Sequence, residues 1–218
     1  SGDVWATVCF QEEDGNTGTL FCGLAVNMQI QTESNCYFMT LELKTGTYLM
    51  DLKEHMTILD LCSAPGGKTT HIAEIMDNTG IVKAFDIYDH KLELIRSNSE
   101  RLGLTNIELD ILDATKECKD LIAVGDRVLI DVPCSGLGII RKKPEIKYTK
   151  KEKELKSLIT VQREIMKNAA KYVKPDGIIL YSTCTINKVE NRGNINWFLS
   201  NFKDFSVEPL NFGQVENL

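Results

Sequence analysis

The sequence lacks the long apolar runs and the basic excess that mark several classes of protein. Among its 218 residues, no apolar run approaches the roughly 20 residues that a membrane-spanning helix needs. The first residues show no basic stretch followed by an apolar one, so a secretory signal is not expected. The net charge of −6 argues against broad nonspecific binding of nucleic acid, although a local basic surface could still bind it.

Closely spaced cysteine pairs are also absent. The chain has seven cysteines and no C-x-x-C pair, so we expect neither a structural zinc site nor another metal site. An odd, scattered set of cysteines is typical of a reduced protein, and we expect a cytoplasmic location. The set comprises Cys9, Cys22, Cys36, Cys62, Cys118, Cys134 and Cys184.

The most informative stretch is LDLCSAPGGKTT, residues 59–70. Its apolar start predicts a buried strand, Pro65-Gly66-Gly67 predicts a turn whose backbone approaches a ligand, and Lys68 begins a helical pattern. A P-loop is excluded, because it needs a glycine where Cys62 stands, and no G-x-G-x-x-G pattern is present. A strand, a glycine turn and a helix N-terminus indicate a nucleotide-type cofactor loop, with an ordinary β–α turn as the alternative.

From residue 57 onward, strand and helix patterns alternate. We expect an α/β fold with a mostly parallel sheet and helices on both faces. Asp89 is a candidate N-cap and Gly103 a candidate C′ residue of one helix. The expected strands are 57–62, 81–85, 107–111, 127–132, 178–182 and possibly 205–209, and the expected helices are 68–77, 89–102, 151–173 and 187–201.

Polar residues follow the ends of these strands, where ligands bind in parallel sheets. Asp86 ends the second strand and is placed to hold ribose hydroxyls, with a solvated loop residue as the alternative. Asp113 follows the third strand and could bind an adenine amino group, although aspartate is also common in turns.

Two cysteines follow the ends of the next two strands. Cys134 comes three residues after Asp131 in DVPCSG, and Cys184 lies in YSTCT ahead of an expected helix. Either cysteine alone is most simply a buried small hydrophobe. Two of them at adjacent strand ends, with Lys68 nearby, indicate a thiolate nucleophile instead.

A basic run covers residues 141–156. It follows the Asp131–Cys134 motif directly, so it could contact RNA phosphates, and Tyr148 could stack on a base. A solvated helix face is the alternative for the basic run, and a packing role is the alternative for the tyrosine.

Together these motifs resemble the S-adenosylmethionine-dependent RNA cytosine-C5 methyltransferases of the Sun-type family, closest to the bacterial 16S rRNA cytosine methyltransferase B group. The resemblance covers about residues 57–210 and rests on LDLCSAPGGKTT, DIYDHK at 86–91, DVPCSGLG at 131–138 with RKKPEIK at 141–147, and YSTCT at 181–185 with Glu190-Asn191. It implies a Rossmann-like methyltransferase domain over 57–218 that acts on RNA, with rRNA expected, without metal or membrane.

The resemblance also implies a role for each site residue. Cys184 would attack C6 of the cytosine, Asp131 would hydrogen-bond the base at N3, Cys134 would act in the release step, and Lys68 would orient Asp131 or the cofactor loop. The target base must be unpaired or flipped out of a helix. The residues expected to hold S-adenosylmethionine are Cys62, Ser63, Ala64, Pro65, Gly66, Gly67, Lys68, Asp86, Asp113 and Asp131.

The two ends of the chain differ from the family pattern, since neither a preceding RNA-binding region nor a final hairpin strand is recognisable. Residues 1–56 form an atypical segment in which CYFMTLELK, 36–44, has the character of the missing strand and could pair with the main sheet as in a permuted chain. A replaced or engineered N-terminus is the plainer alternative. Two other functions stay open: a cytosine methyltransferase on another substrate, with Cys134 as nucleophile, and a module that binds cofactor or RNA without turnover.

Overall fold

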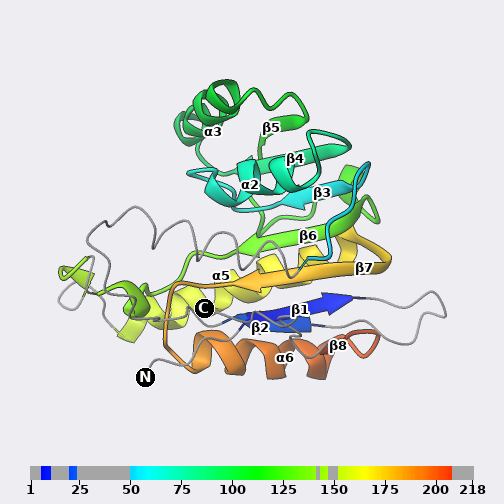
Figure 1. Ribbon diagram of the computed structural model, residues 1–218. Coiled ribbons are helices and arrows are strands. Elements are labelled where there is room, and N and C mark those ends of the chain that lie inside the picture. Colours follow the sequence, from blue (N-terminus) through cyan, green and yellow to red (C-terminus); the bar gives the residue numbers. More distant parts are fainter. Residues whose placement is uncertain (1–5, 11–19, 24–49, 141–142, 147–151, 208–218) are drawn as a thin grey trace, which may run out of the picture.

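The computed structural model describes residues 6–10, 20–23, 50–140, 143–146 and 152–207 (Figure 1). Strands and helices alternate from residue 57 onward, as the sequence pattern predicts. The strands are β1 (Ala6–Phe10), β2 (Leu20–Gly23), β3 (Thr57–Asp60), β4 (Ile81–Asp86), β5 (Ile107–Ile111), β6 (Gly125–Asp131), β7 (Val173–Ser182) and β8 (Ser206–Val207). The helices are α2 (Gly67–Ile75), α3 (Asp89–Leu102), α5 (Glu152–Tyr172) and α6 (Asn194–Asn201), with short turns η1 (Lys119–Leu121), η2 (Leu137–Ile139) and η3 (Val189–Gly193).

The strands form one sheet in the order β5-β4-β3-β6-β7-β2-β1-β8. The five strands from β5 to β7 run parallel, and Asp60 of β3 lies between Ala84 of β4 and Leu129 of β6. The chain moves outward from β3 to β5 and then returns to β6 on the other side of β3. In parallel sheets such a reversal opens a crevice at the carboxyl ends of the two central strands, where ligands bind.

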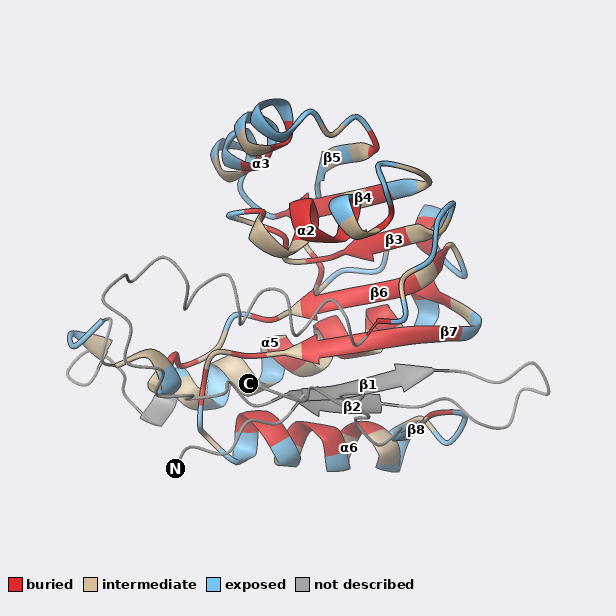
Figure 2. Cartoon of the chain, in the orientation of Figure 1, coloured by how far each residue is buried: buried red, intermediate tan, exposed pale blue. Residues whose placement is uncertain are grey.

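Alternate residues of the central strands face two separate cores. Leu59 and Ile130 pack with α5 and α6, whereas Ile58 and Leu129 pack with α2. Because both faces are covered, these strands are apolar at successive positions, and Figure 2 shows β3, β6 and β7 buried along most of their length. The predicted α/β fold with helices on both faces is confirmed.

Several predicted boundaries differ from the observed ones. β7 begins at Val173, which pairs with Gly125 of β6, and after a shift in register the next paired residue is Ile178, opposite Arg127. The single helix predicted over 187–201 is instead a π-helical turn, η3, followed by α6. Asp89 is wrong as N-cap, since Tyr88 holds that position, whereas Gly103 is confirmed in the left-handed C-terminal position.

The N-terminal segment adds strands to the sheet beyond β7. β1 runs antiparallel to β7, with Thr7 opposite Tyr181, and β2 pairs with β7 in parallel. The extra strand predicted at 36–44 lies outside the described residues. In the part of the chain that the structure describes, no helix is long and apolar enough to cross a membrane.

Candidate functional site

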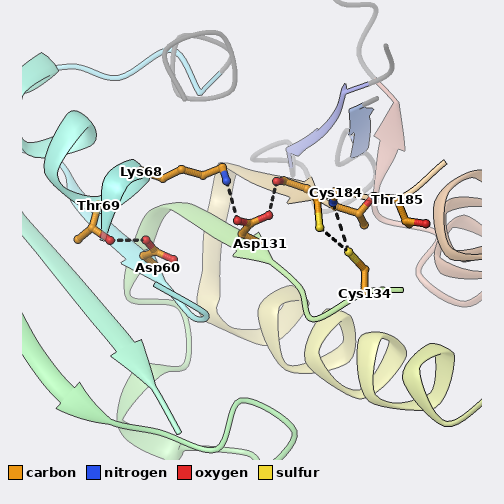
Figure 3. A network of polar contacts seen from close by, with 9 residues as sticks. Asp60, Lys68, Thr69, Asp131, Cys134, Cys184 and Thr185 are labelled. Atoms are coloured by element: carbon orange, nitrogen blue, oxygen red, sulfur yellow. Dashed lines mark hydrogen bonds and ion pairs between the residues drawn. The ribbon is translucent and has the colours of Figure 1, made fainter. Parts of the chain in front are cut away.

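Lys68 and Asp131 form an ion pair at the carboxyl edge of the sheet (Figure 3). The Lys68 Nζ atom lies 2.6 Å from Asp131 Oδ2, and the Ser182 hydroxyl donates to Asp131 Oδ1 at 2.5 Å. Burial of the lysine acts to lower its pKa, but the charge and hydrogen bond of Asp131 outweigh burial and raise the pKa above its ordinary value. The pair therefore holds a carboxylate and a proton donor together beside the sheet.

Cys134 and Cys184 face each other next to this pair (Figure 3). Their Sγ atoms are 3.2 Å apart, and the Cys184 N–H points at Cys134 Sγ at 3.3 Å. The hydrogen bond between the two sulfur atoms lowers the pKa of Cys184 and, together with burial, raises the pKa of Cys134. Of the two thiols, Cys184 therefore loses its proton more readily. A thiolate is the nucleophilic form of cysteine.

The loop between β3 and α2 is held by its own backbone. The Ser63 N–H and hydroxyl both donate to the Phe85 carbonyl, at 2.8 and 2.7 Å, and the Gly66 N–H donates to the Ser63 carbonyl at 2.7 Å. Gly66 has φ +99°, and a Cβ there would meet Ile95 Cγ1 at 2.9 Å. The positive φ and the contact with α3 each favour glycine at this position, and the close approach of a ligand to this turn stays a prediction.

Asp60, at the end of β3, also belongs to this region, although the sequence predicts no catalytic or cofactor role for it. Its side chain is buried, and the Thr69 hydroxyl donates to Oδ2 at 2.7 Å. Oδ1 has no hydrogen-bond partner among the described residues. Burial raises the pKa of Asp60 to about 7, with the nearby charge of Asp131 adding to the effect. Asp60 is therefore a buried acceptor that a donor from a ligand or water would satisfy.

The two other predicted cofactor carboxylates lie after β4 and β5. Asp86 is buried and accepts a hydrogen bond from the Tyr88 N–H at 3.0 Å, and the Lys91 Nζ atom lies 3.5 Å from Oδ1. Asp113 accepts from the Thr115 hydroxyl at 2.6 Å and pairs with a lysine, and these contacts lower its pKa. Its contacts are those of a turn residue, and an adenine contact stays a prediction.

Cys62, predicted as part of the cofactor loop, is not suited to act as a nucleophile. Burial raises the pKa of its thiol, and the nearby charges of Asp60 and Asp131 raise it further. The thiol therefore stays protonated at neutral pH. Of the loop thiol and the two cysteines at the strand ends, only Cys184 has the lowered pKa that favours attack.

The predicted basic segment can be placed only in part. Residues 141–142 and 147–151, including Tyr148, lie outside the described residues, whereas Lys143 and Lys156 are exposed. The segment follows η2, whose Gly138 N–H donates to the Cys184 carbonyl at 3.1 Å. A Cβ at Gly138 would lie 2.8 Å from that carbonyl oxygen, so this position needs glycine for close approach.

Other candidate sites lie away from this cluster. A cleft of about 350 Å³ is lined by β4, β5 and residues around η1, and it includes none of the predicted site residues. Within the described ranges, no three His, Cys, Asp or Glu side chains come together as metal ligands. The candidate catalytic side chains therefore lie together at the ends of β3, β6 and β7.

Solved structures with this fold define the class as Rossmann-like methyltransferases. NSun6 from Pyrococcus horikoshii, crystallised with SFG, has a TM-score of 0.65 and 32% identity, over 72% of this chain and 40% of that one. A methyltransferase homolog protein from the same organism has a TM-score of 0.67 and 30% identity, over 88% of this chain and 62% of that one. The predicted Rossmann-like fold is confirmed.

The chain belongs to the 16S rRNA methyltransferase RsmB/F family, whose pattern matches residues 47–218. The probable ribosomal RNA small subunit methyltransferase B of Bacillus subtilis (strain 168) is 44% identical over 160 residues, covering 73% of this chain. The human tRNA (cytosine(72)-C(5))-methyltransferase NSUN6 is 40% identical over 164 residues, covering 70% of this chain. The chain spans 34 to 36% of the length of these two relatives.

Proposed function

We propose that this chain carries the catalytic domain of an S-adenosylmethionine-dependent RNA cytosine-C5 methyltransferase, with ribosomal RNA as its substrate. The observation that carries the proposal is the meeting of the Lys68–Asp131 pair with a cysteine pair whose Sγ atoms are 3.2 Å apart. The names of the family and of the B. subtilis relative support ribosomal RNA. A cytoplasmic location is part of the same proposal.

The residues at the ends of β3 and β4 fit S-adenosylmethionine. The unpartnered Oδ1 atom of buried Asp60 suits an ammonium or a water bound to it, and the Asp86 carboxylate suits ribose hydroxyls. Ile87 and Tyr88 are each 52% exposed beside Asp86 and offer an apolar surface to a flat ring. The loop 62–67 would hold the methionine part. When bound, this cofactor supplies an electrophilic methyl group.

The two cysteines have different roles in the covalent mechanism: Cys184 attacks the base, and Cys134 takes part in its release. The Cys184 thiolate, whose pKa is lowered by the Cys134 hydrogen bond, forms a bond to C6 of the cytosine and makes C5 nucleophilic. After C5 is methylated, a base removes the C5 proton and the Cys184–C6 bond breaks, which returns the thiolate. Cys134, which faces Cys184 Sγ, takes part in this release.

The ion pair handles the charge that forms on the base. Negative charge moves toward N3 as Cys184 adds to C6. Asp131 can hydrogen-bond that nitrogen once it carries a proton, and its ion-pair partner Lys68 is the group that can pass one to it. Lys68, with its Nζ atom 2.6 Å from Asp131, can supply the proton that N3 takes up and recover it when Cys184 leaves. Because Ser182 also donates to Asp131, the carboxyl group is oriented before the base arrives.

The division of the chain is part of the proposal. The catalytic domain is residues 57–218, and the strands β1 and β2 of the N-terminal segment extend its sheet. The basic segment 141–156 contacts RNA phosphates, which is supported by the exposure of Lys143 and Lys156 and by the backbone link from Gly138 to Cys184.

Covalent capture of an RNA that contains 5-fluorocytosine tests the mechanism. Fluorine at C5 blocks the release step, so the adduct accumulates when S-adenosylmethionine is present and can be seen on a denaturing gel. We expect Cys184→Ser to abolish capture and Cys134→Ser to retain it. Capture that depends on Cys134 and survives Cys184→Ser would overturn the assignment of the nucleophile.

That reversed result would favour the alternative in which Cys134 attacks, as in cytosine methyltransferases that act on DNA. The opposite pKa directions of the two thiols argue against it. A second alternative is a module that binds cofactor or RNA without turnover. Cofactor binding without methyl transfer to rRNA fragments would support this second alternative.

A further inference from the structure

Glu190 is a fully buried carboxylate to which the proposed mechanism gives no role. It lies in the π-helical turn η3, five or six residues after the Cys184 loop. Its two oxygens accept four hydrogen bonds, from the Ser135 N–H, the Ser135 hydroxyl, Gln162 Nε2 and Asn187 Nδ2, at 2.5 to 3.0 Å. All four groups are donors, which suits a group with acceptors only.

These hydrogen bonds hold the loop that carries Cys134 in position. The Ser135 N–H and hydroxyl, next to Cys134 in the chain, both donate to Glu190. The Gln162 amide donates at 2.9 Å to Glu190 Oε2 and at 2.9 Å to the Pro133 carbonyl on the other side of Cys134. The carboxylate thus fixes the backbone on both sides of one sulfur atom.

The same cluster reaches the loop that carries Cys184. The Ser135 hydroxyl is 2.6 Å from the Thr185 hydroxyl, and Thr185 directly follows Cys184. Asn191, the neighbour of Glu190, donates to the Thr185 carbonyl at 2.9 Å and accepts from the Thr183 hydroxyl at 2.7 Å. One turn of η3 therefore binds both cysteine loops, which are 50 residues apart in the sequence.

We propose that Glu190 is a positioning residue that holds the Cys134 loop against Cys184. It touches neither sulfur directly and acts through Ser135, so that the Cys134 thiol keeps its short contact with Cys184 Sγ. The inference deepens the proposed function, because the contact matters if Cys184 is the nucleophile. The cluster is buried, and π-helical turns of this kind are frequent at functional sites.

The variant Glu190→Gln tests whether the position of the Cys134 loop depends on the carboxylate of Glu190 or only on the size of its side chain. It has the same shape, but its amide nitrogen would face donors that now bond to an oxygen, so the Cys134 loop must shift or lose a hydrogen bond. The readout is the rate at which iodoacetamide alkylates Cys184, followed against pH by mass spectrometry of the peptide that contains it. Asp131 and Lys68 also act on Cys184, with opposite effects on its pKa, and both stay in place.

We expect the midpoint for Cys184 alkylation to rise in Glu190→Gln, with the rate at pH 7 falling roughly fivefold, as for a pKa rise of a little under one unit. Cys134→Ala should give a similar shift, and adding Glu190→Gln to it should give no further shift, because both act through one contact. Glu164→Gln, on the adjacent α5, is the matched control and should leave the midpoint unchanged.

An unchanged midpoint in folded Glu190→Gln would overturn the proposal, as would a shift of equal size when Cys134 is already alanine. If Glu190→Gln does not fold, Ser135→Ala replaces it, since this change removes only the hydroxyl that links Glu190 to Thr185. It should shift the midpoint in the same direction, and no shift would overturn the proposal. The assay needs neither RNA nor methyl donor, so a failure of the proposed function would not affect it.

Discussion

The buried carboxyl of Asp60 predicts that this protein loses stability as the pH rises toward neutrality. The side chain is 1% exposed, and burial raises its pKa to about 7, against roughly 3.9 for an unfolded aspartate. Between these two values the folded state binds a proton that the unfolded state has released. The stability from this group is therefore complete below about pH 4 and is lost as the pH rises through 7.

The size of the effect follows from the two pKa values. At about 1.4 kcal/mol for each unit of pKa difference, the full contribution is on the order of 4 kcal/mol, and roughly 2 kcal/mol of it falls between pH 5 and pH 7. These are upper values, because a bound water at the unpartnered Oδ1 would stabilise the charged form. Asp60→Asn cannot ionise, and its carbonyl can still accept from Thr69.

Urea unfolding of wild type and Asp60→Asn at pH 5, 6, 7 and 8 measures this difference. We expect the free energy of unfolding of the wild type to fall relative to the variant by roughly 2 kcal/mol from pH 5 to pH 7. Asp120→Asn, at an exposed position, is the control and should run parallel to wild type. Parallel curves for Asp60→Asn and wild type would refute the reasoning.

Three further predictions concern the site. Lys68→Met should slow covalent capture of 5-fluorocytosine RNA roughly a hundredfold, because Asp131 loses its proton donor, and an unchanged time course would contradict this. Asp86→Ala should weaken S-adenosylmethionine binding in calorimetric titration roughly tenfold, and equal affinity would remove Asp86 from the cofactor site. Gly138→Ala should slow capture while leaving cofactor affinity unchanged, because its Cβ would press on the Cys184 carbonyl, and capture at the normal rate would show that this contact yields.

Local sequence determined the main strands and the family. Strands buried on both faces are apolar at successive positions, so Ile58-Leu59 and the run from Val128 to Ile130 could be recognised without knowing their neighbours. The boundaries were less certain. Asp89 has the chemistry of an N-cap yet lies within the first turn of α3, because the helix begins one residue earlier than the cap pattern indicates.

The sequence also indicated which residues would be near one another, because parallel strands end at one edge of the sheet. Lys68, Asp131, Cys134 and Cys184 were expected there, and the structure brings them together. A serine at the end of a strand has no special pattern, so the contact of Ser182 with Asp131 could not be foreseen.

Only the tertiary structure decided the pKa directions of the two cysteines. It also decided that Asp60 and Glu190 are buried and which groups they contact. A hydrogen bond between sulfur atoms 50 residues apart sets opposite pKa directions for two thiols that look alike in sequence. Asp60 and Glu190 are ordinary acidic residues until the packing of α2 and α5 removes water from them. Sequence patterns follow local backbone geometry, whereas burial and long-range hydrogen bonds depend on which surfaces the fold brings together.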